Sequence, residues 1–387
     1  MIDDVMIVGA GPAGAVAAAV LARAGARVRV VDRAVFPRDK LCGDTVNPGT
    51  LHELRRLDLA GGVDAIGLRV DGMRLSGPGG VSVDGRYPEG LHGRAIVRRD
   101  LDWALLQEAI AAGADFESGI AVRTPIVADA RGMKHIVGVI ARGNGRTCEW
   151  RARVTIAADG RRSILASALG LVRHPVRPRR WAIGAYYDQV HGLSSLGEMH
   201  VRRGRYIGVA PVPGGLANVC LVRPFARGGG VPPSFETLLA DELARDWALR
   251  DRFADARMVG RPAVLGPLAV DVTPSHFEGL LTAGDAAGFV DPMTGDGLRF
   301  AVRGGALAAD AALDALTHGW TGVHDRLATR RRQEFGAKWR FNRTLRAWVA
   351  SPAAVVASAV AARVVPGALA RIVTTAGDCR AAAIEYR

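Results

Sequence analysis

Short apolar runs and glycine-rich turns alternate at the start of the chain. Val5–Val8 is a continuous apolar run, typical of a strand buried on both faces of a parallel sheet. Residues 12–24 are rich in alanine, a strong helix former, and Gly25 follows them as a candidate C-cap. A second, largely apolar run covers Val28–Val31, interrupted by Arg29. The pattern predicts a strand, a turn, a helix and a second strand.

The pattern changes to alternation further along the chain. From Leu68 to Tyr87, and again over 180–222, apolar and polar residues alternate between glycine-rich turns, which predicts antiparallel strands. Further strands are expected up to 153–160 and at the start of 279–288. Helical patterns cover 48–60, 98–113, 234–254, about 297–316, and the chain from about 323 onward.

The β-rich stretches interrupt the strand–helix stretches, which indicates domains that are discontinuous in sequence. A chain of 387 residues is long enough for two or three domains. We predict an α/β fold: a Rossmann-type nucleotide-binding domain, an antiparallel β-sheet substrate domain and a helical C-terminal region. The predicted limits are 1–65, 94–174 and 271–320 for the first domain, 66–93 and 175–270 for the second, and 321–387 for the helical region.

The net charge of +13 does not by itself indicate nucleic-acid binding. Only three of the 51 basic residues are lysines, and the arginines are spread along the chain with few aromatic residues among them. This distribution favours a compositional bias toward arginine over a nucleic-acid surface.

The four cysteines lie far apart, with neither metal-ligand spacing nor a dense disulfide framework: Cys42, Cys148, Cys220 and Cys379. The start of the chain is acidic, and its apolar run is broken by glycines and a proline. The apolar stretch 353–370 contains Arg363 and Pro366 and makes a poor membrane span. We therefore expect a cytoplasmic protein without a metal site.

A glycine motif joins the first strand to the first helix. In "GAGPAG", Gly9 permits a tight turn, Gly11 lets the backbone approach a pyrophosphate, and Gly14 lets the helix pack closely. Asp32 ends the second strand eighteen residues after Gly14, where it can accept hydrogen bonds from a ribose diol. Together these features predict a dinucleotide-binding site.

Three further segments resemble the p-hydroxybenzoate-hydroxylase-like flavoproteins: "VRRDLDWALL", "AADGRRS" and "AGDAAGFVDPMTGDGLRFA". The resemblance implies FAD, bound without a covalent link. It places Arg98 near the FAD phosphates and Asp285 at the ribityl chain. The cofactor-binding residues expected from the motifs are Gly9, Gly11, Ala13, Gly14, Asp32, Arg33, Arg98, Asp159, Gly284, Asp285, Gly295, Gly297 and Leu298. A helix starting near Gly297 would direct its positive end at the anionic edge of reduced flavin.

Within that superfamily, "FPRDKLCGD" resembles the Pro-Arg-x-Lys-x-Cys-Gly segment of geranylgeranyl reductases and related FixC-like oxidoreductases. The resemblance places Cys42 near flavin and substrate, as a catalytic residue or as a small buried hydrophobe. Lys40 reads as a solvated loop charge somewhat better than as a substrate contact. Pro292 and Arg299 are the other catalytic candidates, since both belong to the predicted flavin turn and the helix after it.

Two enzymatic functions are compatible with these motifs. The leading prediction is an NAD(P)H-linked monooxygenase of a phenolic, polyketide-like or other apolar molecule. The alternative is a C=C reductase of a polyprenyl or similar lipid. A protein that only senses redox state is a third interpretation, and the absence of the Trp-x-Trp-x-Ile-Pro pattern disfavours a halogenase.

The sequence specifies the substrate pocket and any surface for a partner less closely than the cofactor site. Only a minority of the candidate cavity-wall residues are expected to line a pocket: Trp181, Tyr186, Tyr206, Pro211 and Pro213. The basic stretch 325–348 reads as a solvated helix face, with contact to a membrane surface or an acidic carrier protein as the alternative.

Overall fold

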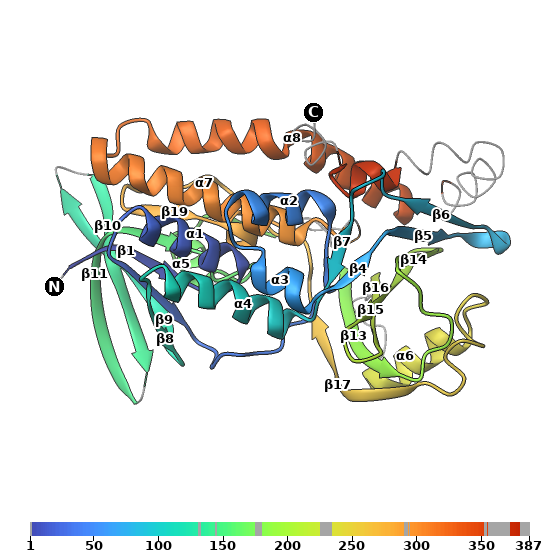
Figure 1. Ribbon diagram of the computed structural model, residues 1–387. Helices are drawn as coiled ribbons and strands as arrows, with labels where there is room; N and C mark the ends of the chain where they lie inside the picture. Colours follow the sequence, from blue (N-terminus) through green and yellow to red (C-terminus); the bar gives the residue numbers. More distant parts are fainter. Residues whose placement is uncertain are drawn as a thin grey trace.

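The computed structural model describes residues 2–130, 133–143, 145–174, 180–224, 234–289, 293, 295–351, 354 and 372–379. Two seven-stranded sheets form the two halves of the molecule, and most helices lie over the first (Figure 1). The helices are α1 (Pro12–Arg23), α2 (Pro48–Arg56), α3 (Gly61–Ile66), α4 (Arg98–Ala111), α5 (Ile164–Ala168), α6 (Phe235–Ala244), α7 (Gly297–His318) and α8 (Val323–Ala350), with 3₁₀ turns η1 (Pro78–Gly80) and η2 (Gly284–Ala287).

The first sheet combines a parallel and an antiparallel part. Its strands are β1 (Asp3–Val8), β2 (Val28–Asp32), β8 (Asp115–Ser118), β9 (Ala121–Ala130), β10 (Met133–Gly143), β11 (Arg146–Ala157) and β19 (Leu280–Thr282). β8, β2, β1, β11 and β19 are parallel neighbours, whereas β10 pairs antiparallel with the first half of β11 and β9 pairs antiparallel with β10. The carboxyl ends of the parallel strands therefore meet at one edge, beside the turn before α1.

The second sheet is antiparallel except at one junction. Its order is β17 (Arg257–Leu265), β13 (Arg180–Asp188), β16 (Leu216–Pro224), β15 (Arg205–Val212), β14 (Leu196–Arg202), β5 (Gly72–Ser76) and β6 (Ser82–Arg86). β5 and β14 run parallel, which the alternation pattern did not predict. Smaller pairings join β3 (Thr45–Val46), β7 (Gly93–Ala95) and β4 (Leu68–Val70), and β12 (Val172–Arg173) with β18 (Asp271–Val272).

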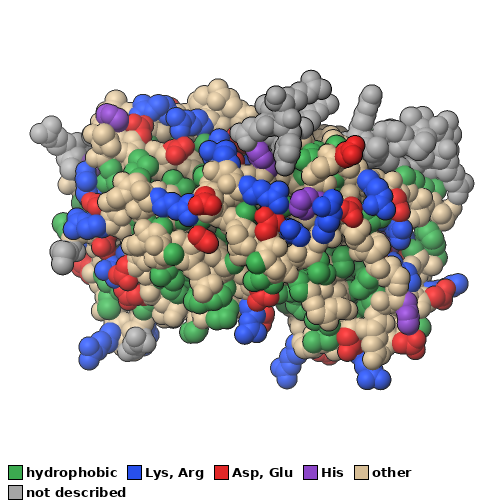
Figure 2. All heavy atoms as spheres, viewed as in Figure 1, with side chains coloured by type: hydrophobic (Ala, Val, Ile, Leu, Met, Phe, Trp, Pro, Cys, Tyr) green, Lys and Arg blue, Asp and Glu red, His purple; other side chains and the backbone are tan. Residues whose placement is uncertain are grey.

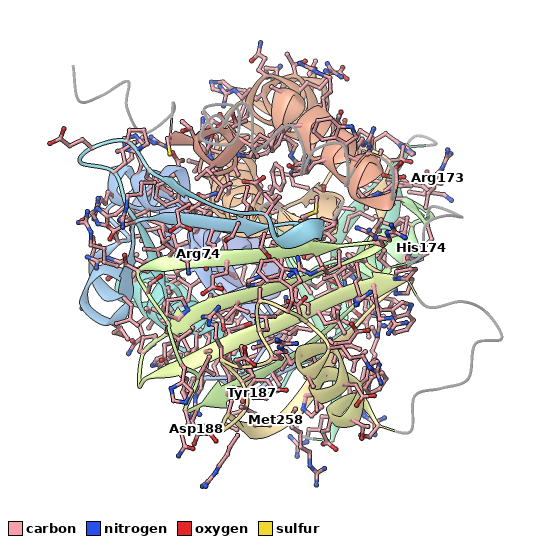
Figure 3. All side chains as sticks on the ribbon, turned by 90° about the vertical axis from the view of Figure 1, so that its right-hand side faces the viewer. Arg74, Arg173, His174, Tyr187, Asp188 and Met258 are labelled. Atoms are coloured by element: carbon pink, nitrogen blue, oxygen red, sulfur yellow. The ribbon has the colours of Figure 1, made fainter. Side chains whose placement is uncertain are left out.

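The two faces of the second sheet meet different surroundings. Leu239 and Leu243 of α6 pack against one face, in a core that includes Ile207 and Val219. Figure 3 looks onto the sheet with α6 in front, and labels Tyr187 on β13. The opposite face carries Ala182, Tyr206 and Val222, which cluster with Met293. Met293 lies just before residues 295–297, the flavin-type turn at the start of α7. The sheet therefore forms a wall between α6 and the centre of the molecule.

Most predicted elements are present, but two predicted helices end early. The stretch 48–60 is helical only over α2, which ends at Arg56, because Asp58 adopts a left-handed backbone conformation with φ of 54°; α3 begins after it, at Gly61. The stretch 234–254 is helical only to Ala244. There the Asp246 carboxylate accepts hydrogen bonds from Arg202 and from the backbone N–H of Ala248, which favours a turn. The exact domain limits stay a prediction.

The basic residues of α8 are largely paired. Arg326 contacts Asp314 at 2.7 Å and Arg330 contacts Asp310 at 3.4 Å, both across the α7–α8 contact. On the face shown in Figure 2, basic and acidic side chains are interspersed. Among the described residues, every helix is too short or too polar to span a membrane. Contact between α8 and a membrane or carrier protein stays a prediction.

Candidate active site

The turn between β1 and α1 needs glycine at two positions because the backbone is too close for a side chain. Gly9 has φ of 102°, and a Cβ there would lie 2.4 Å from the carbonyl oxygen of Ala158. A Cβ on Gly14 would lie 1.8 Å from the carbonyl oxygen of Gly9. Gly11 differs, since its nearest neighbour would be the Arg38 guanidinium at 3.5 Å. The space above Gly11 is thus open to a ligand.

Asp32 holds this turn in shape. Its two carboxylate oxygens accept hydrogen bonds from the backbone N–H groups of Ala10 and Ala34, each at 2.9 Å. Each oxygen retains lone-pair capacity for another donor, so the predicted ribose contact is compatible with these bonds. Arg33, the next residue, is exposed.

A buried carboxylate anchors two arginines beside the turn. Asp102 of α4 is fully buried and accepts two hydrogen bonds from Arg98, at 2.7 and 2.8 Å. Arg38 contacts the same carboxylate at 2.9 Å, while its Nη1 is buried and has no hydrogen-bond partner among the described residues. This unpartnered donor next to Gly11 is suited to a phosphate oxygen. Arg38 belongs to the segment "FPRDKLCGD", but the spacing of residues in that segment did not assign a role to Arg38.

The loop 36–49 passes between the two sheets and contributes to the cavity. Lys40 lines this cavity instead of extending into solvent, and burial together with Arg98 lowers the pKa of its ammonium group. Asp285 of η2 interacts electrostatically with Lys40, although burial raises the pKa of its carboxyl. The loop thus brings the Lys40 cation to Asp285, the acidic residue of the motif "AGDAAGFVDPMTGDGLRFA".

Cys42 also belongs to this loop and lies beside Arg98 of α4. Burial raises the pKa of the Cys42 thiol, and the nearby Arg98 guanidinium opposes this increase through its charge and a side-chain hydrogen bond. The thiol is therefore protonated at neutral pH but adjacent to a charge that would stabilise its thiolate. Cys42 lines the cavity together with Gly295 and Gly297, as the motifs predicted.

Behind Cys42, sequence reasoning missed a buried carboxyl group at Asp44. Its Oδ2 accepts hydrogen bonds from the Tyr186 hydroxyl at 2.6 Å and the Asn218 amide at 2.5 Å. Asn218 also donates to the Cys42 carbonyl oxygen at 3.0 Å. Burial raises the pKa of Asp44 to about 6 despite these two donors. The partners come from β13 and β16, so no local spacing could have indicated this cluster.

The opposite side of the cavity is formed by η2 and the start of α7. Gly284, Asp285, Gly295, Gly297 and Leu298 all line it, as do Gly11, Ala13 and Arg98 from the first half of the chain. Asp159 instead accepts a hydrogen bond at 2.7 Å from the backbone N–H of Ile164, the first residue of α5, while its neighbour Gly160 lines the cavity. The sequence therefore identified residues from distant segments that share one site.

The other two predicted catalytic residues are Pro292 and Arg299. Pro292 lies outside the described residues. Arg299 is 7% exposed and is held by Asp378 at 2.6 Å and Glu334 at 2.5 Å. It is not among the cavity-lining residues, because α7 directs it toward α8 and the C-terminal segment. This pairing leaves the predicted catalytic role of Arg299 without geometric support.

The cavity has a volume of about 360 Å³ and mainly apolar walls. Tyr206 is the one member of the five predicted wall residues that lines it. Ser76, His200 and Glu198 are hydrogen-bonded in series at its edge, at 2.7 and 2.9 Å. Ser76 Oγ also accepts two hydrogen bonds from Arg202, which leaves it unsuited to act as a nucleophile.

Comparison with known proteins identifies the family. The model of the "FAD binding domain" family matches residues 3–339. The chain belongs to this FAD-binding family. Among its relatives, a menaquinone reductase of Mycolicibacterium smegmatis is 33% identical over 327 residues, covering 79% of this chain and 75% of the relative. Digeranylgeranylglycerophospholipid reductase 1 of Methanopyrus kandleri is 31% identical over 326 residues, covering 81% of each chain.

Solved structures agree on the fold. A geranylgeranyl bacteriochlorophyll reductase-like protein from Thermoplasma acidophilum superposes with a TM-score of 0.77 and 22% identity, covering 92% of this chain and 89% of that one. Flavin-dependent halogenases have similar folds at comparable identity. At this level of identity the likeness shows the fold alone.

The family membership and the site agree with each other. The open space above Gly11 and the unpartnered donor of Arg38 fit a diphosphate, while Asp285 and the turn before α7 fit the ribityl and ring portions of FAD. The protein is an FAD-dependent oxidoreductase. The resemblance to the geranylgeranyl reductase branch is thereby confirmed, and the finer question is which reaction the cavity supports.

Proposed function

We propose that the protein reduces a C=C bond in an isoprenoid or similarly apolar lipid, with NAD(P)H as the electron source. The observation that carries this proposal is the apolar cavity between the flavin-type turn and the second sheet. It extends to Leu345 and Trp348 of α8, and Trp348 is 50% exposed. An apolar substrate could therefore enter at the end of α8 and reach the wall that contains Cys42.

The relatives support a reductase over the monooxygenase that led the sequence-based predictions. The relatives that are more than 30% identical include menaquinone reductases and a digeranylgeranylglycerophospholipid reductase. Both names denote enzymes of isoprenoid lipids. No contact in the described part of the chain specifically favours oxygen transfer, so the reductase is the function we infer.

Reduction of a C=C bond adds a hydride to one carbon and a proton to the other. When bound, FAD supplies the hydride. Cys42 is the proposed proton donor, because its thiol is protonated at neutral pH and lies in the cavity wall. Arg98 would stabilise the thiolate left after donation, and water would return the proton. Leu41 packs against Gly184 of β13, which fixes the loop that carries Cys42.

The test is anaerobic turnover. The reduced enzyme is mixed without oxygen with geranylgeranyl lipids or menaquinone, and the product is examined by mass spectrometry for two added hydrogen atoms. We expect Cys42→Ala to slow turnover by roughly 10²-fold or more, the range typical of a general acid, with unchanged FAD content. Cys148→Ala is the matched control, since Cys148 lies on β11 outside the cavity lining.

One result would contradict the reductase, and another would contradict only the role of Cys42. A product that contains oxygen from O₂, formed only in air, would indicate the monooxygenase instead. Equal turnover by the Cys42→Ala and Cys148→Ala variants would remove Cys42 as proton donor while leaving the reductase intact.

A further inference from the structure

The segment 372–379, close to the C-terminus, lies in the wall of the same cavity. Ile372, Val373, Ala376 and Gly377 line it together with the flavin-type turn. More than three hundred residues separate this segment from the loop 36–49, so the sequence motifs gave no reason to connect them.

Polar bonds fix the segment to three helices. The backbone N–H of Gly49, in α2, donates to the Gly377 carbonyl oxygen at 3.0 Å. The Asn47 side chain, at the start of α2, donates to the Ala376 carbonyl oxygen at 3.3 Å. From α7, Arg299 donates to the carboxylate of Asp378 at 2.6 Å. These bonds satisfy carbonyl groups that would otherwise be unpaired in a largely buried place.

Lys338 of α8 forms the third attachment. Its ammonium group donates to the carbonyl oxygens of Thr375 and Ala376, the latter at 3.0 Å, and contacts the carboxylate of Asp296 at 3.1 Å. An ammonium group has three hydrogens, and these three acceptors can use all of them. The Lys338 side chain is only 10% exposed and Asp296 is 1% exposed, so this ion pair is nearly dry.

Asp296 connects the attachment to the cofactor side of the cavity. It lies between Gly295 and Gly297, both of which line the cavity at the start of α7. Asn47 donates to the same carboxylate oxygen at 3.3 Å. Lys338 thus holds the C-terminal segment and the flavin-type turn at a fixed separation.

The apolar side of the segment packs closely against β6 of the second sheet and against Tyr87, which follows β6. Val373 is 2% exposed and packs with Tyr87 and Val70. A Cβ on Gly85 of β6 would lie 2.6 Å from Val373, and one on Gly377 would lie 2.6 Å from the Tyr87 ring. Glycine at both positions lets the backbone approach closely, so the segment is an integral part of the wall.

We propose that segment 372–379 is a substrate-recognition wall and that Lys338 is the residue that positions it. The nature of the ligand, an apolar isoprenoid chain, rests on the proposed function, whereas the wall itself rests on the contacts above. Ala376 is the critical position, because it lines the cavity, has a small side chain, and is joined through its carbonyl oxygen to Asn47, which also lines the cavity.

The experiment measures binding of geraniol, farnesol and geranylgeraniol to the oxidised, FAD-loaded protein, from changes in the flavin absorption spectrum. Ala376→Phe should weaken binding at least about tenfold with unchanged FAD content, because a phenyl group fills space that the ligand needs. Ala254→Phe is the matched control, since Ala254 is exposed and outside the cavity lining. Equal binding by the two variants would overturn the assignment of the wall.

Lys338 is tested by Lys338→Met, with Lys134→Met as control, since Lys134 is an exposed residue of β10. Hydrogen exchange should become at least about tenfold faster in 372–379 and at the Gly49 amide only in the first variant, and isoprenoid binding should fall with FAD retained. Unchanged exchange in Lys338→Met would overturn the positioning role.

A separate result distinguishes failure of the proposed function from failure of the proposed wall. If none of the three alcohols perturbs the wild-type flavin spectrum, the isoprenoid proposal fails. The wall is then judged with a fluorescent anilinonaphthalene dye that binds apolar cavities. Ala376→Phe must reduce dye binding relative to Ala254→Phe, and equal dye binding would overturn the wall independently of the substrate.

Discussion

At the residue scale, the protonation of the buried Asp44 carboxyl group affects the stability of the protein. Its carboxyl group is fully buried between the loop 36–49 and the second sheet, and only Oδ2 has hydrogen-bond donors that the described residues supply. Removing a carboxylate from water disfavours its charged form, which raises the pKa of Asp44 from 3.8 to about 6. The left-handed backbone of Asp44, with φ of 50°, suits Asp or Asn better than most residues.

This raised pKa predicts a pH-dependent loss of stability. Between about pH 4 and 6 the folded protein binds the Asp44 proton more tightly than the unfolded chain does. The contribution of Asp44 to the free energy of unfolding, about 3 kcal/mol, is therefore fully present below pH 4 and is lost as pH rises through about 6. Urea unfolding of wild type and Asp44→Asn across this range should give a difference curve in which the variant becomes relatively more stable as pH rises. A flat difference curve would contradict the raised pKa.

At the scale of elements, the contact between α1 and α7 depends on Gly305. A Cβ on Gly305 would lie 2.3 Å from the carbonyl oxygen of Ala13, so Gly305→Ala forces the two helices apart. Overpacking of this kind costs roughly 1–3 kcal/mol, more than the 0.5–1 kcal/mol that alanine gains over glycine in a helix. Because Ala13 lines the cavity, FAD affinity should also fall. Thermal melts and FAD retention after gel filtration measure both effects.

The neighbouring residue provides the control for that prediction. A Cβ on Gly304 would meet its nearest atom, the backbone nitrogen of Gly284, at 3.5 Å, an ordinary contact. Gly304→Ala should therefore keep FAD and gain roughly 0.5–1 kcal/mol from helix propensity. If both variants behave alike, the close approach of α1 and α7 does not limit cofactor binding.

The elements that the sequence predicted best are those whose pattern depends on local chemistry. The alanine-rich run gave α1 and the apolar runs gave β1 and β2, within one or two residues at most ends. The early end of α6 could not be predicted, because the Asp246 carboxylate is held by Arg202 from β14. The parallel pairing of β5 with β14 likewise depends on a long-range register that the alternation of side chains does not encode.

At the scale of the whole molecule, the motifs located the cofactor side of the site but not its other walls. Gly11, Arg98 and Asp285 were predicted because each belongs to a motif whose geometry serves one ligand. Asp44 and the segment 372–379 were missed, because their roles come from contacts with strands and helices far away in sequence. The same long-range pairing explains Arg299, which a local motif placed at the flavin and which Glu334 and Asp378 hold elsewhere.

Because FAD would contact several distant segments at once, its binding should stabilise the molecule as a whole. The residues around its expected position come from the β1–α1 turn, the loop 36–49, η2 and the start of α7. A ligand that binds only the folded state adds about 4 kcal/mol at a thousandfold excess over its dissociation constant. We therefore expect the melting temperature of the apoprotein to rise with added FAD until the site is saturated and then by a constant increment per tenfold excess.

FMN separates the two ends of this site. It carries the ring and ribityl phosphate but lacks the adenosine phosphate, which the turn at Gly11, the Asp32 carboxylate and the free donor of Arg38 are placed to hold. At equal concentration FMN should therefore raise the melting temperature much less than FAD. Arg38→Met should reduce the FAD effect while leaving the smaller FMN effect largely unchanged. Equal stabilisation by FMN and FAD would show that the β1–α1 turn does not bind the dinucleotide.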